Sequence, residues 1–404
     1  MSGIVVLGGG FAGVWSAAGA VRLARAAGRD LPVTLIDPGD DLVIRPRLYQ
    51  AEPDRMRISL DRILGPVGVR RIAGTATAVH TAHRTVTVVG RDGETAEIPW
   101  ERLILATGSR LVRPGVPGAE LLHNVDTLPA AAALDSHLHR LPHLPPGAGP
   151  GRYTAVVVGA GFTGLEIATE LVDRLGALAT PEPIRVVLVE RADTVGPELG
   201  PGPRPQIRAA LASLGVEQYL AVGLSAVEPE GVVLSDGTRI AAQTVVWTAG
   251  VQASPLTAGI PADRDRLGRL AVDEQLRVRG VPGVYAAGDT AAADAEPGHP
   301  VLQCCQHALQ LGKFAGHNAA ADLFGLPAVP FAPAPYVTCL DLGPAGAIFT
   351  NGWDRRVVAT GASAKERKRK VNEWWIYPPT DDPGELLRQA DYRFSVRDIP
   401  TPGL

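Results

Sequence analysis

Two apolar runs, at residues 4–7 and 155–158, are each followed at once by a glycine-rich turn and then by a helical pattern. Later apolar runs, at 33–36 and 186–189, are each followed by an acidic residue. Short continuous runs of this kind are typical of strands buried on both faces of a parallel sheet. The pattern therefore predicts one strand–turn–helix–strand unit twice in the same chain.

Each unit continues into alternating apolar and polar positions, which predict antiparallel strands. In the first unit these lie between residues 69 and 98, and in the second a hairpin with an Asp-Gly turn is expected at 231–240. Each half then closes on an apolar run that ends in small residues and glycine, at 103–109 and 245–250. The shared order of these features indicates an internal duplication.

The rest of the chain divides into a third strand near 283–286, a helix from about 303 to 323, and a different region from 331 onward. That last region mixes short strand-like pieces with proline-rich segments and predicts a small α+β appendage. Residues 142–151 are mostly proline and glycine, so we expect neither helix nor strand there and place a domain boundary in them.

The two glycine turns have the spacing that binds a pyrophosphate. They read Gly-Gly-Gly-Phe-Ala-Gly at 8–13 and Gly-Ala-Gly-Phe-Thr-Gly at 159–164. The first glycine of such a turn lets the chain reverse, the second lets a phosphate approach the backbone, and the third lets the helix press against the strand. The phosphates then lie at the N-terminus of a helix, whose free N–H groups attract anions.

Asp37 and Glu190 end the second strands of the two units, where a carboxylate accepts hydrogen bonds from a ribose diol. At the second unit this carboxylate also repels a 2′-phosphate, so Glu190 favours NADH over NADPH. The neighbouring Arg191 offsets part of that repulsion, and NADPH stays an alternative. Two dinucleotides in one chain indicate a flavin, a nicotinamide and redox chemistry.

Composition narrows the class of protein further. The 404 residues are 46% hydrophobic with a net charge of −3, which is ordinary for a globular chain and argues against a nucleic-acid partner. Three cysteines are too few for a disulfide framework, no apolar run approaches 18 residues, and the N-terminus does not resemble a signal peptide. We therefore expect a cytoplasmic protein, as a monomer or homodimer.

One basic and aromatic block, at 365–375, hints at an anionic membrane surface. We favour a solvated helix face beside a buried tryptophan pair, with peripheral contact at the inner face of a membrane as the alternative. His137, His139 and His143 lack further ligands at metal-binding spacing, so we expect them in a solvated linker and predict no metal site.

The ordered motifs resemble those of the two-dinucleotide flavoprotein reductases, the pyridine nucleotide-disulfide oxidoreductase superfamily, over residues 3–325. Within it, the chain is most similar to type II NADH:quinone oxidoreductases and NADH dehydrogenase-like proteins. The resemblance implies an α/β fold with two Rossmann-like domains, for FAD and NAD, in a three-layer ββα architecture. The implied divisions are 1–150 and 271–330 for FAD, 151–270 for NAD(H), and 331–404 for the α+β C-terminal region.

The resemblance also implies which residues bind the coenzymes FAD and NADH. They are Gly8, Gly10, Phe11, Ala12, Gly13, Asp37, Arg45, Ala106, Thr107, Gly108, Gly159, Gly161, Gly164, Glu190, Gly250, Gly288 and Asp289. Asp289 matches the aspartate that holds the ribityl chain of the flavin, with a helix cap as its alternative role. Glu166 matches a catalytic-site glutamate near the meeting point of nicotinamide and flavin, with a first-turn helix carboxylate as its alternative.

The quinone-reducing branch is indicated by Gln306 and Gln310, which match two glutamines of that family's quinone motif. They lie four residues apart, so their amides face the same way on a helix. An amide suits a quinone because its NH₂ group donates to a carbonyl and its oxygen accepts from a hydroxyl. The alternative is a polar helix face that touches solvent or the flavin.

Three departures from the family matter. The region 39–51 lacks the cysteine pair of the disulfide reductases, and we expect no redox role for the adjacent Cys304 and Cys305. Arg45 and Arg47 replace an apolar segment and suit an anionic acceptor or a reduced, anionic flavin, unless they are surface arginines. The amphipathic C-terminal helices that anchor the family to membranes are not evident.

The expected reaction is ping-pong transfer of a hydride from NADH to the flavin and then of two electrons to a quinone. Two alternatives remain. One is a soluble NAD(P)H-dependent flavoprotein that acts on a small anionic or phenolic metabolite, and the other is a redox-sensing flavoprotein with slow turnover.

Overall fold

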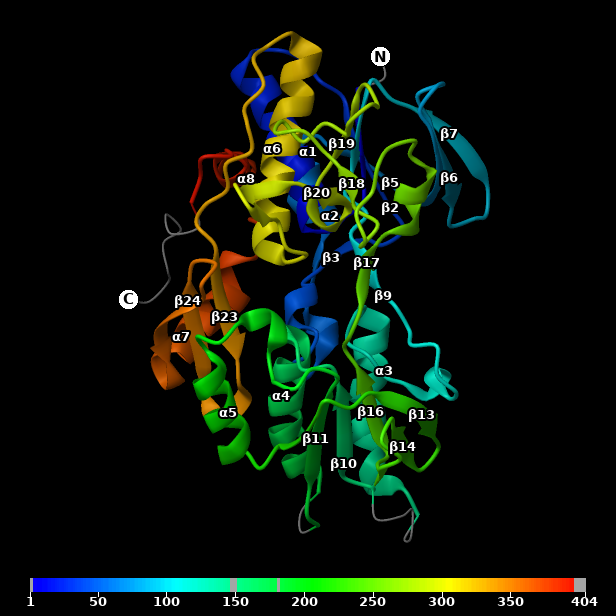
Figure 1. Ribbon diagram of the computed structural model, residues 1–404. Coiled ribbons are helices and arrows are strands. Elements are labelled where there is room, and N and C mark those ends of the chain that lie inside the picture. Colours follow the sequence, from blue (N-terminus) through cyan, green and yellow to red (C-terminus); the bar gives the residue numbers. More distant parts are fainter. Residues whose placement is uncertain (1–2, 146–150, 180–181, 396–404) are drawn as a thin grey trace.

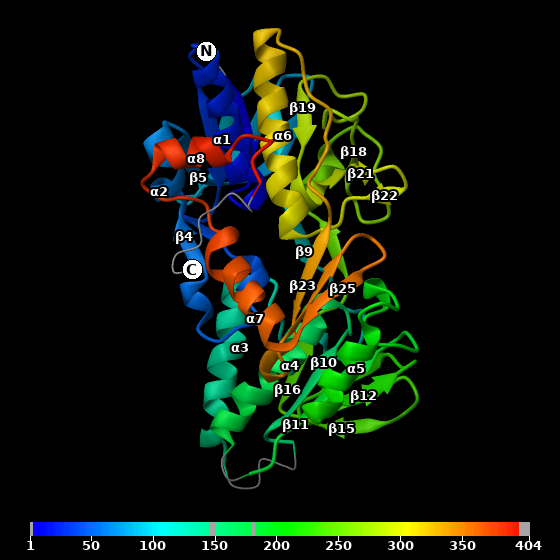
Figure 2. The ribbon, with the colours of Figure 1, turned by 90° about the vertical axis from the view of Figure 1, so that its left-hand side faces the viewer.

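The computed structural model describes residues 3–145, 151–179 and 182–395. It consists of two nucleotide-binding folds placed end to end, with the C-terminal region packed along one side (Figures 1 and 2). The chain passes from the first fold to the second and returns to the first before it enters the C-terminal region. The fold is the expected α/β arrangement.

The first fold is built on a seven-stranded sheet in which the first five strands are parallel. Its order is β19 (Val284–Ala286), β8 (Arg102–Leu105), β1 (Ile4–Leu7), β2 (Val33–Asp37), β5 (Arg70–His80), β6 (Thr85–Gly90) and β7 (Thr95–Pro99). The long strand β5 pairs parallel with β2 and then antiparallel with β6, so the expected antiparallel insertion continues the main sheet. Strand β19, from the third segment, joins this sheet beside β8.

Helices α1 (Phe11–Ala26) and α6 (Cys305–Phe324) pack together beside this sheet (Figure 1). They approach so closely that a Cβ at Gly312 would lie 2.4 Å from the carbonyl oxygen of Ala12, and one at Gly316 would lie 2.0 Å from that of Ser16. Any larger residue would push the helices apart. This contact fixes the N-terminal turn of α6 next to the first glycine turn.

The second fold has a parallel sheet of β12 (Glu217–Leu220), β11 (Arg185–Glu190), β10 (Thr154–Val158) and β16 (Thr244–Trp247). Helix α4 (Phe162–Leu178) packs against β10 and β11, and helix α5 (Arg204–Ser213) belongs to the same fold. A separate antiparallel sheet contains β13 (Leu224–Glu228), β14 (Gly231–Leu234) and β15 (Arg239–Ala241), of which the last two form the predicted hairpin. Strands β9 (Ser109–Leu111) and β17 (Val251–Ala253) pair antiparallel where the chain crosses between the folds.

A 3-10 turn reaches into the first two residues, 142 and 143, of the predicted boundary. Helix α3 (Leu128–Arg140) carries His137 and His139, and one 3-10 turn at Leu141–His143 follows it. The prediction of solvated linker histidines is therefore wrong for His137, whose ring lies 4.4 Å from that of His123 and whose Nε2 is 3.1 Å from Thr244 Oγ1. His139 and His143 are exposed. Within the described residues no group of three or more His, Cys, Asp or Glu side chains is placed to hold a metal. Residues 146–150 of the predicted boundary lie outside the description.

The C-terminal region is the expected small α+β unit. It contains an antiparallel sheet of β23 (Val337–Asp341), β24 (Ala347–Asn351) and β25 (Arg356–Thr360), then α7 (Gly361–Lys370), a π-helical turn at Val371–Trp375 and α8 (Pro383–Gln389). It is packed on both folds: β23 and the 3-10 turn Gly343–Ala345 lie against α4 of the second fold, and α8 lies against α1 of the first (Figure 2). Among the described helices, none has the length and apolar character needed to cross a membrane.

The remaining α-helix and strand pairs are short. They are α2 (Leu60–Leu64) with the strand pairs β3 (Asp41–Val43) with β4 (Arg57–Ser59), β18 (Leu270–Ala271) with β20 (Ala291–Ala292), and β21 (Asp294–Glu296) with β22 (His299–Pro300).

Candidate functional site

The first glycine turn has the geometry of a phosphate cradle. Gly8 has a φ of +106°, and a Cβ there would lie 2.3 Å from the carbonyl oxygen of Ala106. A Cβ at Gly13 would lie 1.8 Å from the carbonyl oxygen of Gly8, whereas one at Gly10 would meet no described atom within 4 Å. The first and third glycines are therefore required by packing, and the middle one leaves open space where a pyrophosphate would approach.

Asp37 closes this turn from the end of β2. Its carboxylate accepts hydrogen bonds from Gly9 N at 2.6 Å and Gly39 N at 2.7 Å, and burial raises its pKa above the usual value. Nearby, at the end of β8, the buried hydroxyl of Thr107 has no hydrogen-bond partner in the described structure. A buried, unpaired hydroxyl beside an open cradle fits a dinucleotide such as FAD.

Asp289 lies on the turn after β19. Ser109 Oγ donates to its carboxylate at 2.6 Å, and Arg45 Nη1 lies 3.6 Å away, while burial raises the pKa of the Asp289 carboxyl. The preceding Gly288 has a φ of +67°, and a Cβ there would lie 2.8 Å from that of Ala12. These contacts hold Asp289 against the start of α1, where the family's ribityl-binding aspartate is expected.

Arg45 and Arg47 are engaged by protein groups. Arg45 forms an ion pair with Asp126 and donates to Ser109 Oγ at 2.9 Å. Arg47 donates to Gln50 Oε1 at 2.9 Å and to Tyr377 OH at 2.7 Å. Both arginines are half-buried and tie separate segments together, so they lie at the surface with protein partners.

The second turn repeats the first. Gly159 has a φ of +107°, and a Cβ at Gly164 would lie 1.7 Å from the carbonyl oxygen of Gly159. Glu190 accepts from Ala160 N at 2.7 Å and from Ala192 N at 2.9 Å, which matches the role of Asp37. Gly250, with a φ of +81°, lies in the crossing between β16 and β17.

Glu166 is buried in an ion pair that joins the second fold to the C-terminal region. Lys368 Nζ lies 2.8 Å from Glu166 Oε1, both side chains are at most 7% exposed, and Asp341 N donates to the same oxygen at 3.1 Å. Burial raises the pKa of Glu166 to about 7, although the Lys368 ammonium opposes that rise. The alternative role as a first-turn helix carboxylate is wrong, because Glu166 lies beyond the first turn of α4.

A polar network extends from this pair toward the first fold. Tyr49 OH donates to Asp341 Oδ2 at 3.0 Å, and Asn372 Nδ2 donates to Tyr49 OH at 3.3 Å. Burial raises the pKa of Tyr49 well above its usual value. Sequence reasoning missed Tyr49, Asp341 and Lys368, because their partners are remote in sequence and no spacing signals the contacts.

The basic block is only partly solvated, and Trp374 and Trp375 are half-buried, which corrects the prediction of a solvated helix face beside a buried tryptophan pair. Lys368 is buried against Glu166, while Lys365 pairs with Asp341 and Lys370 with Glu366. The guanidinium of Arg367 lies over the ring of Phe349, 3.7 Å from its centroid. Most of its cations are therefore engaged within the protein. Membrane contact through this block stays a prediction.

The amides of Gln306 and Gln310 face the same way, and both contact the segment that leads into β23. Gln306 Nε2 donates to Pro335 O at 3.2 Å and its Oε1 accepts from Val337 N at 3.4 Å. Gln310 Oε1 accepts from Ala334 N at 2.7 Å. In this arrangement the two side chains hold a crossing segment against α6, and their role toward a quinone stays a prediction.

Two free cysteines, Cys304 and Cys305, lie at the start of α6. Burial raises the pKa of Cys304 to about 12 and also raises that of Cys305. A raised pKa disfavours the thiolate, which is the form needed for disulfide exchange. The expectation that neither residue acts in redox chemistry stays a prediction.

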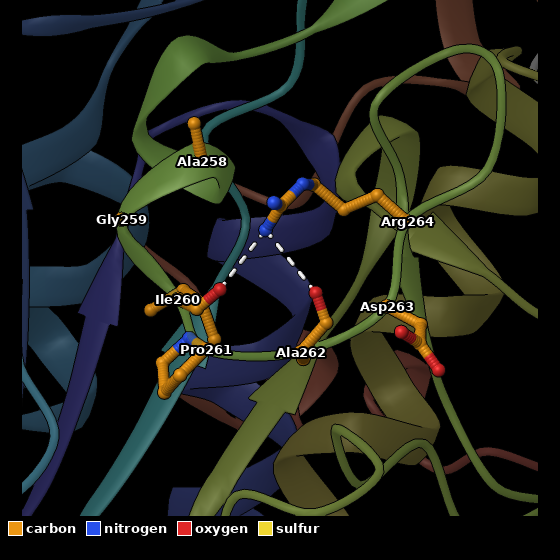
Figure 3. A pocket seen from close by; sticks show the side chains of 7 residues that line it. All are labelled: Ala258, Gly259, Ile260, Pro261, Ala262, Asp263 and Arg264. Atoms are coloured by element: carbon orange, nitrogen blue, oxygen red, sulfur yellow. Dashed lines mark hydrogen bonds between the residues drawn. The ribbon is translucent and has the colours of Figure 1, made fainter.

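A shallow hollow elsewhere on the surface is a feature of one loop. It is lined by residues 258–264, and the guanidinium of Arg264 donates to the carbonyl oxygens of Ile260 and Ala262 across it (Figure 3). None of its lining residues belongs to a glycine turn or to the Glu166 network. We assign it no function.

The chain is similar to known oxidoreductases over most of its length. It is 46% identical, over an alignment of 413 positions with gaps, to an NADH dehydrogenase-like protein of Mycobacterium tuberculosis. The alignment covers 98% of this chain and all of that protein. The chain is 31% identical to the type II NADH:quinone oxidoreductase NdhA of the same organism, over 73% of this chain and 67% of that one. It is 27% identical to demethylphylloquinone reductase NdbB of Synechocystis, over 86% of each chain.

Two solved structures share the fold. NDH2 from Plasmodium falciparum in complex with NADH matches with a TM-score of 0.77 at 13% identity, over 91% of this chain and 93% of that one. The sulfide:quinone oxidoreductase of Aquifex aeolicus matches with a TM-score of 0.77 at 18% identity, over 98% and 94%. At this level of identity, the likeness concerns the fold alone.

The family model described as pyridine nucleotide-disulphide oxidoreductase matches residues 2–312, a span that includes both glycine turns and Asp289. This match, together with the relatives, confirms the predicted coenzymes FAD and NADH and the expected type of enzyme. The chain therefore belongs to the pyridine nucleotide-disulphide oxidoreductase family and is an NAD(P)H oxidoreductase.

Proposed function

We propose that this enzyme oxidises NADH and passes two electrons to a quinone by a ping-pong mechanism. The observation that carries the proposal is the pair of glycine turns, each closed by its own acid, Asp37 and Glu190. The quinone is supported by the names of the relatives, among them a type II NADH:quinone oxidoreductase and a demethylphylloquinone reductase. The absence of a cysteine pair at 39–51 agrees with an acceptor other than a disulfide.

In this proposal bound FAD would supply the redox chemistry, which is the transfer of two electrons from NADH to the acceptor. The protein's part is to bind, orient and shield. The turn at 8–13 and Asp37 hold the first dinucleotide, and Asp289 is placed to accept hydrogen bonds from a hydroxylated chain. The turn at 159–164 and Glu190 hold NADH.

Glu166 is the candidate catalytic residue that lies deepest. Its oxygen is held by Lys368 and by the backbone of Asp341, so its position is set by the C-terminal region as well as by α4. With a pKa raised to about 7 by burial, its carboxyl group is able to give or take a proton near neutral pH. We propose that it assists proton balance as the acceptor is reduced.

The contacts of Arg45 and Arg47 bear differently on the alternative of an anionic or phenolic metabolite guided by arginines. Arg45 already faces two carboxylates, those of Asp126 and Asp289, so its charge is largely compensated. Arg47 is bound to neutral groups, Gln50 and Tyr377, and retains its charge. Arg47 is thus the better candidate of the two for contact with an acceptor.

Steady-state oxidation of NADH by a soluble quinone tests the acceptor. Gln306→Ala and Gln310→Ala should each lower kcat/KM for the quinone by about tenfold, the loss expected for about one hydrogen bond in the transition state. Reduction of the bound flavin by NADH, measured by stopped flow, should be unchanged. The exposed Gln252 on β17 supplies a matched control, Gln252→Ala.

Both amides also contact residues 334–337, so each variant could act by loosening this segment and not by losing a contact with the quinone. Thermal unfolding of the same variants separates the two causes, because only loosening of the segment lowers the unfolding temperature. Quinone kinetics that are unaffected by either glutamine but lost on Arg47→Ala would favour the metabolite alternative. Negligible turnover with every quinone, together with a long-lived reduced protein, would favour the sensing role.

A further inference from the structure

The N-terminus of the second phosphate-binding helix is already in contact with an acidic side chain. Glu198 Oε1 accepts a hydrogen bond from Phe162 N, the first residue of α4, at 2.9 Å. A Cβ built on Gly161 would lie 2.7 Å from the same oxygen. The carboxylate therefore lies over the middle glycine of the turn, where the motif keeps space for a phosphate.

The first turn differs in this one respect. A Cβ on Gly10, the counterpart of Gly161, would meet no described atom within 4 Å. The two turns otherwise match, since Gly8 and Gly159 have φ values of +106° and +107° and Asp37 and Glu190 each bond to the turn backbone. The turn expected to hold FAD is thus open, and the one expected to hold NADH is covered by a carboxylate.

The position of Glu198 is set by its loop. It lies on a 3-10 turn, Pro197–Leu199, between Gly196 and Gly200, both of which have positive φ values. Leu199 anchors this turn in the core, being 2% exposed. The backbone is held from the C-terminal region as well, because Arg355 Nη2 donates to the carbonyl oxygen of Glu198 at 3.3 Å.

Arg355 is itself fixed. It is 8% exposed, and its Nη1 donates to Tyr336 OH at 3.1 Å. The backbone of Glu198 is therefore anchored on two sides, while its side chain is exposed and has Phe162 N as its hydrogen-bond partner. Such a side chain is able to leave the helix end without unfolding the loop.

We propose that Glu198 is an internal competitor for the pyrophosphate of NADH: its carboxylate covers the turn in the free enzyme and moves away when the dinucleotide binds. This inference rests on the proposed binding of NADH at the 159–164 turn. The N–H groups at one helix end attract an anion, but two anions at that end repel each other. Glu198 thereby lowers the affinity for NADH and for NAD alike and hastens release of the product.

Such a device suits the second turn and not the first. FAD stays bound through many turnovers, so its site gains nothing from a competing anion. NADH must enter and NAD must leave in every ping-pong cycle, and release is often the slow step of such enzymes. Glu198 is in this sense a residue that sets affinity for the dinucleotide, and it has no part in the chemical step.

The test is the affinity of the complete, FAD-loaded protein for ADP-ribose and for NAD, measured by calorimetry. ADP-ribose carries the pyrophosphate and lacks the nicotinamide, so it reports on the turn alone. Glu198→Ala should bind both ligands about fivefold more tightly, a change within the range of helix-end charge effects. Inhibition by NAD in steady state should strengthen in parallel, and the gain should shrink at high salt.

Two further variants sharpen the result. Glu198→Gln keeps a hydrogen-bond acceptor for Phe162 N but removes the charge, so it should give most of the gain without loss of the helix cap. Asp193→Ala removes an exposed acid at the start of the same loop and should change the affinity by less than twofold. An equal gain in affinity on Asp193→Ala would show that any nearby negative charge lowers the affinity, and it would overturn the inference.

Unchanged or weaker binding in both Glu198 variants would also overturn it and would leave Glu198 a simple helix cap. If the wild-type protein binds neither ADP-ribose nor NAD while it retains FAD, the proposed function fails first. The two failures are therefore distinguishable.

Discussion

Gly164→Ala should slow reduction of the enzyme by NADH by about 100-fold while the protein keeps its FAD. The added Cβ would lie 1.7 Å from the carbonyl oxygen of Gly159 and 2.9 Å from Thr248 Oγ1, so α4 must shift away from the turn that it helps to form. A displacement of about 1 Å at a reacting geometry costs on the order of 100-fold in rate. Stopped-flow measurement of flavin bleaching by NADH reads this directly.

The same helix provides the control. Gly176→Ala also lies in α4, but its Cβ would meet no described atom within 4 Å. It should leave the reduction rate unchanged and stabilise the fold by up to about 1 kcal/mol, since alanine favours a helix interior over glycine. Normal bleaching of Gly164→Ala by NADH would remove the second turn from the dinucleotide site.

Lys368→Ala should destabilise the protein by about 3–5 kcal/mol, because it leaves the buried Glu166 carboxylate without its cation. Loss of the ammonium also removes the group that holds the pKa of Glu166 down, so the carboxyl should become protonated around neutral pH. Equilibrium unfolding in urea measures the loss. Docking of α7 on α4 should weaken as well, since this pair joins the two.

Lys370→Ala is the matched control for that change. Lys370 lies on the same helix and pairs with Glu366, whose side chain is 55% exposed, so its removal should cost less than about 1 kcal/mol. The double variant Glu166→Gln with Lys368→Met removes both charges and should recover most of the stability. Equal effects of Lys368→Ala and Lys370→Ala would show that burial of the Glu166 pair contributes nothing special.

The local features of the dinucleotide sites were readable from sequence alone. The turns at 8–13 and 159–164, the acids Asp37 and Glu190, the hairpin after Gly231 and the helix near 303–323 all follow from short-range patterns. Strand, turn and helix preferences act within a few residues, so spacing along the chain is enough to find them. The resemblance to a family extended this to Asp289, which the structure places against α1.

The contacts that join distant segments were decided only by the tertiary structure. Lys368 meets Glu166 across 202 positions of sequence, and a block of cations predicted to be solvated instead supplies the buried partner of a candidate catalytic residue. His137 and His139 of the expected linker likewise belong to α3, where His137 packs against His123. Burial depends on what folds over a side chain, and a local pattern carries no record of that.

The duplicated phosphate-binding unit, and with it the redox class, was therefore determined by the sequence by itself. Whether each turn is open or covered was decided only by the tertiary structure. Gly10 and Gly161 occupy equivalent positions in the two turns, yet Gly10 faces open space and Gly161 faces Glu198, 37 residues further along. That difference depends on a loop whose backbone is anchored by Arg355 from the far end of the chain. Long-range hydrogen bonds and packing set such contacts, and only the folded chain brings their partners together.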